Sequence, residues 1–359
     1  MKHLLPFFLL LLLALNALAQ PGTNDTTFNT MDPGYANGLG PDGQVRAVAI
    51  QNDGKVIIGG LFTTFNEQTI NRIARINEGV LDTSFHPGSG FNDYVQCIAI
   101  QSDGKIVVGG NFTAYNGVTR NRIARLNTDG SLDMTFNPGN GPNQLVRSIA
   151  IQSDGKIVIA GNFINYSGTG RNRIARLNTN GLLDNAYNPG TGFNSTVYAI
   201  DIQADDKIVA VGGFTLFNGA VRERIARLQT DGTLDASFSP GFGFDDIAYS
   251  IALAPNGNIV AGGDFDLFNG TARNKIAVVD PSGNLVTSFN PGSGFNQIVY
   301  SLKAQADGKI LAGGSFTSYK GSTANKIIRL DTLGNEDTTF DTGSGFSSSG
   351  APVVYSIQT

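Results

Sequence analysis

Four carboxylates form the densest cluster of side chains that could do chemistry. Asp245 and Asp246 come just before an expected strand, and Asp264 and Asp266 follow the next strand along the chain. Antiparallel neighbours would bring those two ends together. Such hard oxygen ligands could hold Ca²⁺, or a carboxylate pair could supply an acid and a base for sugar chemistry. Ordinary variation of surface aspartates is the alternative, and no other cofactor is predicted.

Other constellations that could support catalysis are scarce. Beyond position 19 the only histidine is His86, so a zinc site lacks ligands and no nucleophile is placed beside the imidazole. The single cysteine, Cys97, takes a position that other copies of a repeat give to small residues such as Ser148 and Ala199, which indicates packing. The sequence leaves an enzyme open but favours a non-catalytic protein.

Composition limits the partners of the chain. The net charge is −4 and 15% of the residues are charged, against about 25% in ordinary domains. Neither a nucleic-acid surface nor a polybasic membrane patch is indicated. We expect a monomer whose partner is a protein or a glycan.

The first 19 residues have the layout of a secretory signal peptide. Lys2 precedes an apolar run at 4–15, and Ala17 and Ala19 frame a small-residue cleavage site. Twelve residues at about 1.5 Å each are too short for a bilayer core of about 30 Å. The sequence therefore predicts a secreted or cell-surface protein with no membrane insertion after cleavage, whose residues 20–359 form a single domain.

A unit of about 51 residues recurs six times between about 45 and 340. Its aromatic landmark is repeated without insertions at Phe85, Phe136, Tyr187, Phe238, Phe289 and Phe340. A period this strict means that each copy is one supersecondary unit that buries its face against its neighbours.

Each copy has the content of a four-stranded sheet. In the copy that begins at 146, a strand at 146–151 is followed by Asp154-Gly155 and a β-branched strand at 156–159. Asp-Gly between two such runs is the strongest local hairpin signal. Strands at 173–177 and 183–187 complete the unit, and helical periodicity is absent. The fold class predicted is an all-β propeller of six four-stranded blades.

The repeat resembles the delta-60 repeat in runs such as Gln51-Asn52-Asp53-Gly54-Lys55 and Asn71-Arg72-Ile73-Ala74-Arg75. That family is a secreted bacterial β-propeller repeat of undefined function, so the resemblance implies a fold and an exported location but no activity. A glycine is also found in the second strand of every copy, which makes sense where another backbone approaches closely. These glycines are Gly60, Gly110, Gly161, Gly212, Gly263 and Gly314.

An arginine in the third strand and an aspartate in the fourth are lost together in the fifth copy, where Val278 and Val286 replace them. Removing one member of a buried ion pair strands a charge, whereas replacing both is tolerated. We therefore predict five ion pairs and one apolar contact; anion binding by the arginines is the alternative. The pairs are Arg75 and Asp82, Arg125 and Asp133, Arg176 and Asp184, Arg227 and Asp235, and Arg329 and Asp337.

The longer loops carry one aromatic residue per copy on the face where propellers usually bind ligands. They could form a ring of platforms for sugars or proteins, or they could be the hydrophobic plugs of each loop. These residues are Phe65, Tyr115, Tyr166, Phe217, Phe268 and Tyr319.

Both ends of the chain carry short segments that match part of a further copy of the repeat. Residues 25–29 match a fourth strand and residues 354–359 match a first strand. Two interpretations stay open. Either the ring has six blades with two loose ends, or the chain is a fragment of a seven-bladed ring.

Overall fold

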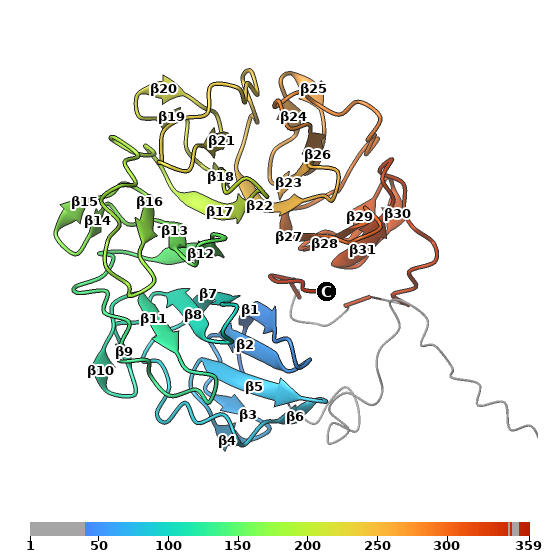
Figure 1. Ribbon diagram of the computed structural model, residues 1–359. Coiled ribbons are helices and arrows are strands. Elements are labelled where there is room, and N and C mark those ends of the chain that lie inside the picture. Colours follow the sequence, from blue (N-terminus) through green and yellow to red (C-terminus); the bar gives the residue numbers. More distant parts are fainter. Residues whose placement is uncertain (1–39, 344, 347–351) are drawn as a thin grey trace, which may run out of the picture.

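The computed structural model describes residues 40–343, 345–346 and 352–359. Six sheets stand around a common centre as the blades of a propeller (Figure 1), which confirms the predicted fold class. We number the blades one to six along the chain. Their innermost strands are β1 (Val45–Ile50), β7 (Val95–Ile100), β12 (Val146–Ile151), β17 (Val197–Ile202), β22 (Ala248–Leu253) and β27 (Val299–Ala304).

Each inner strand pairs antiparallel with a second strand through the predicted Asp-Gly type of turn. In blade three, Ile151 lies opposite Ile157, and Gly155 adopts the positive φ of 80° that such a turn requires. We call this edge of the ring the turn rim and the opposite edge the long-loop rim. The second strands are β2 (Val56–Gly60), β8 (Ile106–Gly110), β13 (Ile157–Gly161), β18 (Ile208–Gly212), β23 (Ile259–Gly263) and β28 (Ile310–Gly314).

The third strands pair with the second strands, but the fourth strand is almost absent. Only blade one keeps a fourth strand, β6 (Val80–Leu81), and the other five blades reduce it to a single bridge such as Leu126 with Leu132. In five blades the chain turns away after this pairing because the aspartate that directly follows Leu81 or its equivalent accepts the amide two residues further on, which starts a turn. The third strands are β5 (Ile73–Asn77), β11 (Ile123–Leu126), β16 (Ile174–Leu177), β21 (Ile225–Leu228), β26 (Ile276–Val279) and β31 (Ile327–Leu330).

The longer loops, which join the second and third strands, each fold into a small hairpin at the long-loop rim. A residue with positive φ, such as Asn116 at 46°, makes the tight turn of each one. The hairpins pair β3 (Thr64–Phe65) with β4 (Gln68–Thr69), β9 (Ala114–Tyr115) with β10 (Val118–Thr119), β14 (Asn165–Tyr166) with β15 (Thr169–Gly170), β19 (Leu216–Phe217) with β20 (Ala220–Val221), β24 (Leu267–Phe268) with β25 (Thr271–Ala272), and β29 (Ser318–Tyr319) with β30 (Ser322–Thr323).

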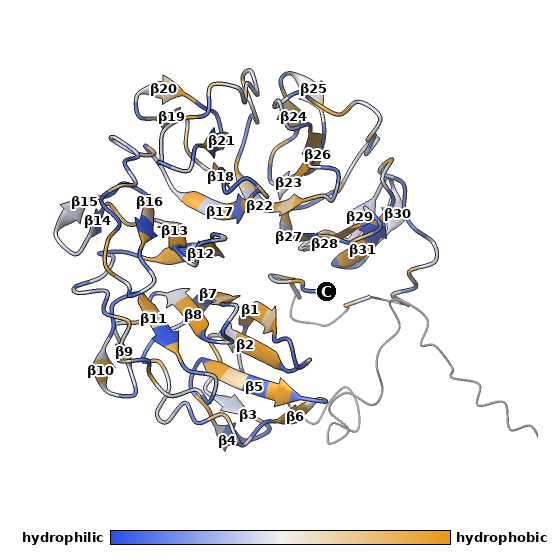
Figure 2. Cartoon of the chain, in the orientation of Figure 1, coloured by the Kyte–Doolittle hydropathy of each residue, from blue (hydrophilic) through white to orange (hydrophobic). Residues whose placement is uncertain are grey.

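The core consists of the faces that neighbouring blades press together. Second and third strands are buried along almost their whole length, and the hydrophobic residues gather in the strands (Figure 2). The glycine that ends each second strand is explained by contact, as predicted. A Cβ at Gly161, for example, would collide with the main-chain oxygen of Leu145, and the five equivalent glycines meet the same obstacle.

The C-terminal residues 352–359 lie inside the ring, next to the inner strands β27 and β1 (Figure 1). The amide of Ile357 donates to Ser301 Oγ of blade six at 2.9 Å. On the other side, the amide of Val48 in blade one donates to Ser356 Oγ at 3.2 Å. This segment therefore joins the last blade to the first.

The same contact joins two complete blades, since Ile200 N donates to Ser148 Oγ at 3.1 Å between blades three and four. Residues 354–359 thus take the place of a seventh inner strand, as their sequence match predicts, although they are not assigned as a strand. The other matching segment, 25–29, and the expected signal peptide, 1–19, lie outside the described residues. Among those described, no helix is long and apolar enough to cross a membrane.

Candidate functional site

The structure gives each of the four clustered carboxylates a local partner. Lys275 Nζ lies 3.3 Å from Asp264 Oδ1 and 2.7 Å from Asp266 Oδ1. Asp245 Oδ1 accepts the amides of Asp266 and Leu267 at 3.0 and 2.8 Å. Asp246 accepts the amide of the residue that follows it.

The role of Asp245 belongs to the repeat and is not special to blade five. In blade two, Asn92 Oδ1 accepts the amides of Thr113 and Ala114 at 2.9 and 3.0 Å in the same way. The side chains that hold the hairpin of each blade are Asp42, Asn92, Asn143, Asn194, Asp245 and Asn296. Across the part of the chain that the structure describes, no group of three or more His, Cys, Asp or Glu side chains is placed to hold a metal ion. The calcium site at Asp245, Asp246, Asp264 and Asp266 stays a prediction.

The aromatic residues of the long loops are buried, so they are not platforms for a ligand. Their exposed fractions lie between 0% and 4%. The hairpin folds each ring inward, and the tyrosine hydroxyls donate hydrogen bonds to main-chain carbonyls inside the blade. Tyr166, for example, donates to the Gly181 carbonyl at 2.6 Å. The alternative interpretation, that they plug the loops, fits the structure. The six are Phe65, Tyr115, Tyr166, Phe217, Phe268 and Tyr319.

All five arginine–aspartate pairs are formed in the structure. The distances between Arg Nε and Asp Oδ2 are 2.8 Å for Arg75–Asp82, 2.7 Å for Arg125–Asp133, 2.9 Å for Arg176–Asp184, 2.7 Å for Arg227–Asp235 and 2.7 Å for Arg329–Asp337. In blade five, Val278 and Val286 belong to one apolar cluster.

Sequence reasoning missed two further members of this network. Lys105 Nζ lies 3.0 Å from Asp133 Oδ2, and Gln101 Oε1 accepts from Arg125 Nη1 at 3.3 Å. Burial alone would raise the pKa of Asp133, but hydrogen bonds from Thr135 and Lys105 hold it well below its usual range. In blade five both extra members are also replaced, by Asn258 and Ala254.

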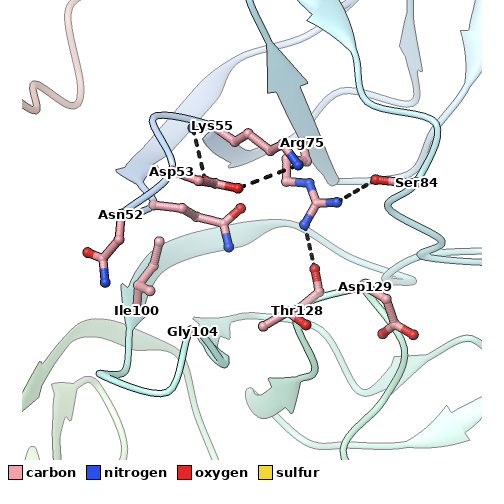
Figure 3. Close-up of a pocket in the computed structure, with 10 residues that line it drawn as sticks. Asn52, Asp53, Lys55, Arg75, Ser84, Ile100, Gly104, Thr128 and Asp129 are labelled. Carbon is pink, nitrogen blue, oxygen red and sulfur yellow. Dashed lines mark hydrogen bonds and ion pairs between the residues drawn. The ribbon is translucent and has the colours of Figure 1, made fainter.

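In blades one to four the arginine also donates a hydrogen bond to the next blade. Arg75 Nη1 donates to the Thr128 carbonyl of blade two, across a cavity of about 410 Å³ at the turn rim (Figure 3). The Arg125 guanidinium makes the equivalent bond to Thr179, at 2.5 Å. These side chains are already paired, which argues against anion binding as their main role.

A different set of residues, which we call the channel belt, changes in type from copy to copy although the pairing of the strands does not require the change. It consists of the second residue of each inner strand and its equivalent in the C-terminal segment. Since Val45 lies opposite Gly60, where the long loop begins, the belt encircles the centre of the ring at the long-loop rim. Its members, all half-buried, are Arg46, Gln96, Arg147, Tyr198, Tyr249, Tyr300 and Tyr355.

Four consecutive members form an aromatic arc. Ring centroids are 4.7 Å apart for Tyr198 and Tyr249, 5.3 Å for Tyr249 and Tyr300, and 5.5 Å for Tyr300 and Tyr355. Burial raises the pKa of Tyr249 to about 12, with help from the neighbouring tyrosines and the carboxylates of Asp264 and Asp246. The Tyr249 phenol is therefore a neutral donor at physiological pH.

Two arginines close the circle at the ends of the arc. The Arg147 guanidinium lies 4.6 Å from the Tyr198 ring centroid, and that of Arg46 lies 5.6 Å from the Tyr355 centroid. Arg46 Nη1 also donates to Gln96 Oε1 at 3.0 Å. The belt is thus aromatic on one side and cationic on the other.

The belt had a signal in the sequence. Aligned inner strands read Val-Arg-Ala, Val-Gln-Cys and Val-Arg-Ser in the first three copies, then change to tyrosine at the second position in every later one. His86, by contrast, lies exposed at the surface. Burial raises the pKa of the Cys97 thiol, which makes it a poor nucleophile.

A family described as domain of unknown function (DUF5122) beta-propeller matches the chain six times, at residues 51–85, 101–136, 152–187, 203–238, 254–289 and 305–340. No curated protein matches the chain.

Solved propellers resemble the chain in fold. U3-55K is 12% identical with a TM-score of 0.51, covering 84% of this chain and 81% of its own. Virginiamycin B lyase from Staphylococcus aureus is 16% identical with a TM-score of 0.50, covering 83% and 86%. The extracellular domain of the putative one-component system BT4673 from B. thetaiotaomicron is 15% identical with a TM-score of 0.48, covering 81% of this chain, which spans only 34% of that one. At these identities the likeness shows the fold alone.

Proposed function

Because the chain belongs to the DUF5122 beta-propeller family, which brings no activity with it, we propose a function from the chain's own geometry: an exported, non-catalytic propeller that binds a glycan at the channel belt. Export is supported by the signal-peptide layout of residues 1–19 and by the resemblance to the delta-60 repeat. The observation that carries the binding site is the arc of four tyrosines between two arginines.

The chemistry of the belt suits an acidic sugar. Half-buried tyrosine rings offer flat apolar faces with a hydroxyl at the edge, which matches the apolar face and polar rim of a pyranose. Arg46 uses both terminal nitrogens within the protein, on Gln96 and Gln44. For Arg147, by contrast, Nε alone bonds to a described residue, Asn162 at 2.6 Å. Arg147 is therefore the side chain assigned to a sugar carboxylate, which its planar fork fits.

A non-catalytic role is supported by the carboxylates beside the belt. A general acid needs a free carboxyl group, but Lys275 neutralises Asp264 and Asp266, and Asp245 holds the loop. Binding without turnover is the function that these contacts favour.

The proposal is tested on a glycan array that contains neutral oligosaccharides and their uronate-bearing counterparts, followed by titration calorimetry. We expect Tyr249→Ala to weaken binding about tenfold, since stacking and burial of one aromatic ring contribute about 1.4 kcal/mol. Arg147→Lys should remove the preference for uronates while leaving neutral sugars bound. Phe242→Ala is the matched control, because Phe242 is 78% exposed in the segment between β21 and β22 and lies outside the belt.

The alternative is a carbohydrate-binding or carbohydrate-active propeller that uses the acidic patch with calcium. It is favoured by one observation, that Asp246 and Asp264 lie near enough to Tyr249 to raise its pKa. Binding that is abolished by chelation and by Asp264→Ala would support the patch. Hydrolysis of a polysaccharide that is lost in Asp246→Asn would replace the non-catalytic proposal, and unchanged binding by Tyr249→Ala would contradict the belt.

A further inference from the structure

Blade five has lost the whole polar network that fills the space between neighbouring blades. In the other five blades an arginine guanidinium carbon lies 4.8–5.1 Å above the aromatic landmark ring. In blade five, Val278 stands in place of that arginine above Phe289. Val286, Asn258 and Ala254 replace the aspartate, lysine and glutamine that surround it elsewhere.

A cavity of about 240 Å³ lies at this place, between blades five and six. Its walls include Val260, Val278, Phe289 and Ile310. Blade six also contributes Thr332 and the exposed Asp307, whose carboxylate is paired with Lys309 at 3.7 Å. The equivalent cavity between blades one and two is lined instead by charged and polar side chains such as Arg75, Lys55 and Asp129 (Figure 3). Two cavities at equivalent positions therefore differ in chemistry because of the replaced residues.

One polar feature of the network remains in the apolar cavity. In blades one to four the arginine donates to a main-chain carbonyl of the next blade, which belongs to Thr128, Thr179, Thr230 or Pro281. Thr332 holds the same position in blade six. At the position of the arginine, blade five carries Val278, which cannot donate a hydrogen bond. The acceptor is thus kept while its donor has been removed.

The missing charges decide which ligand fits. A cationic ligand would restore the guanidinium above Phe289, but the aspartate that balances that charge elsewhere is Val286 here. A buried charge without a partner is costly. A neutral aromatic ring can pack against the apolar walls of the cavity, and it needs only one hydrogen-bond donor for the Thr332 carbonyl.

We propose that the cavity between blades five and six binds a small neutral aromatic ligand that carries one hydrogen-bond donor, a phenol or an indole. The size agrees, because a cavity of about 150 Å³ lined by apolar side chains already holds benzene. The ring stacks on Phe289, the donor meets the Thr332 carbonyl, and Asn256 and Asn258 line the polar side. This site lies at the turn rim, away from the channel belt, and is independent of the proposed function.

Titration calorimetry of the purified chain with indole tests the proposal. We expect one saturable site. N-methylindole, which lacks the donor, should bind about three- to tenfold more weakly, as the loss of one hydrogen bond predicts. Equal affinity for the two compounds would overturn the role of the carbonyl, and absence of saturable binding up to the solubility of indole would overturn the site.

The decisive variant rebuilds the network of the other blades: Ala254→Gln, Asn258→Lys, Val278→Arg and Val286→Asp together. Because five blades already fold with these residues, the variant should keep its structure, and indole affinity should fall at least tenfold. Leu182→Ala, at an exposed position on the turn rim of blade three, is the control that should bind as the parent does. If the parent's affinity persists in the rebuilt variant, indole does not occupy this cavity.

Discussion

The network in blade two gives a quantitative test of why charged residues are lost together. Asp133 is 3% exposed and its carboxylate meets both Arg125 and Lys105. Asp133→Val leaves the buried guanidinium without its counter-ion, for which about 3–5 kcal/mol is typical. Since Arg125 keeps its bonds to Thr179 and Gln101, we expect the lower end, about 3 kcal/mol.

The matched variant copies blade five into blade two: Gln101→Ala, Lys105→Asn, Arg125→Val and Asp133→Val. It removes the bond to the next blade, which costs about 1–2 kcal/mol, but it strands no charge and adds buried apolar surface. The fourfold variant should therefore be more stable than the single Asp133→Val variant, by about 1–2 kcal/mol.

Urea denaturation at pH 7 measures both values, provided that the slope of the free energy of unfolding against urea is the same in each variant. A single variant that costs under 1 kcal/mol would show that the pair is too well hydrated to matter. A fourfold variant less stable than the single one would show that the joint replacement in blade five is not compensation.

Three further predictions concern charge and ring closure. Burial alone would raise the pKa of Asp235, but hydrogen bonds from Ser237 and the pairing with Arg227 lower it to about 2. The stability that the ionised Asp235 gives to the fold should therefore be complete above the unfolded pKa of about 3.9 and lost as the pH falls towards 2. Asp235→Asn should destabilise the chain at pH 7 but hardly at pH 2. Burial raises the pKa of Asp201, so this carboxyl group ionises at a lower pH in the unfolded chain than in the folded one. Stability should therefore fall as the pH rises above about 4, and Asp201→Asn should raise the melting temperature at pH 7 but not at pH 3. A Cβ at Gly313 would lie 2.5 Å from Val354 Cγ1 of the C-terminal segment that closes the ring. Gly313→Ala should therefore lower the free energy of unfolding by about 1–3 kcal/mol, measured in thermal melts. The control Gly213→Ala, whose added Cβ would meet no atom nearer than 3.7 Å, should change it by no more than about 0.5 kcal/mol.

The fold could be predicted because the same pattern of strands and turns recurs in six copies. A single Asp-Gly turn is a local signal, but its return every 51 residues fixes the blade, and the joint change to Val278 and Val286 identified a contact without coordinates. The fourth strand was overestimated, since after one bridge Asp133 turns its carboxylate back to the Thr135 amide and ends the pairing.

The candidate site was harder to predict, because exposure depends on packing that residue type does not reveal. Tyr166 in a loop suggests a platform, yet its hairpin buries it. Tyr355 and Arg46 lie at opposite ends of the described chain and meet only because the ring closes. Their connection required the structure, although an alignment of the copies would have shown that both depart from the repeat.

The positions of these departures follow from what a blade must do. A residue between blades contacts two sheets, so a change there leaves a stranded charge unless its neighbours change too. The four replacements around Phe289 remove the opposite charges together and so strand none. A residue at the second position of an inner strand faces the other belt members around the centre of the ring, and neither sheet depends on its identity. Tyrosine, glutamine and arginine are therefore all accommodated at the belt by the same backbone. In a ring of near-identical blades, specificity for a ligand can arise only where the blades differ, and these two places are where the packing of the repeat permits a difference to persist.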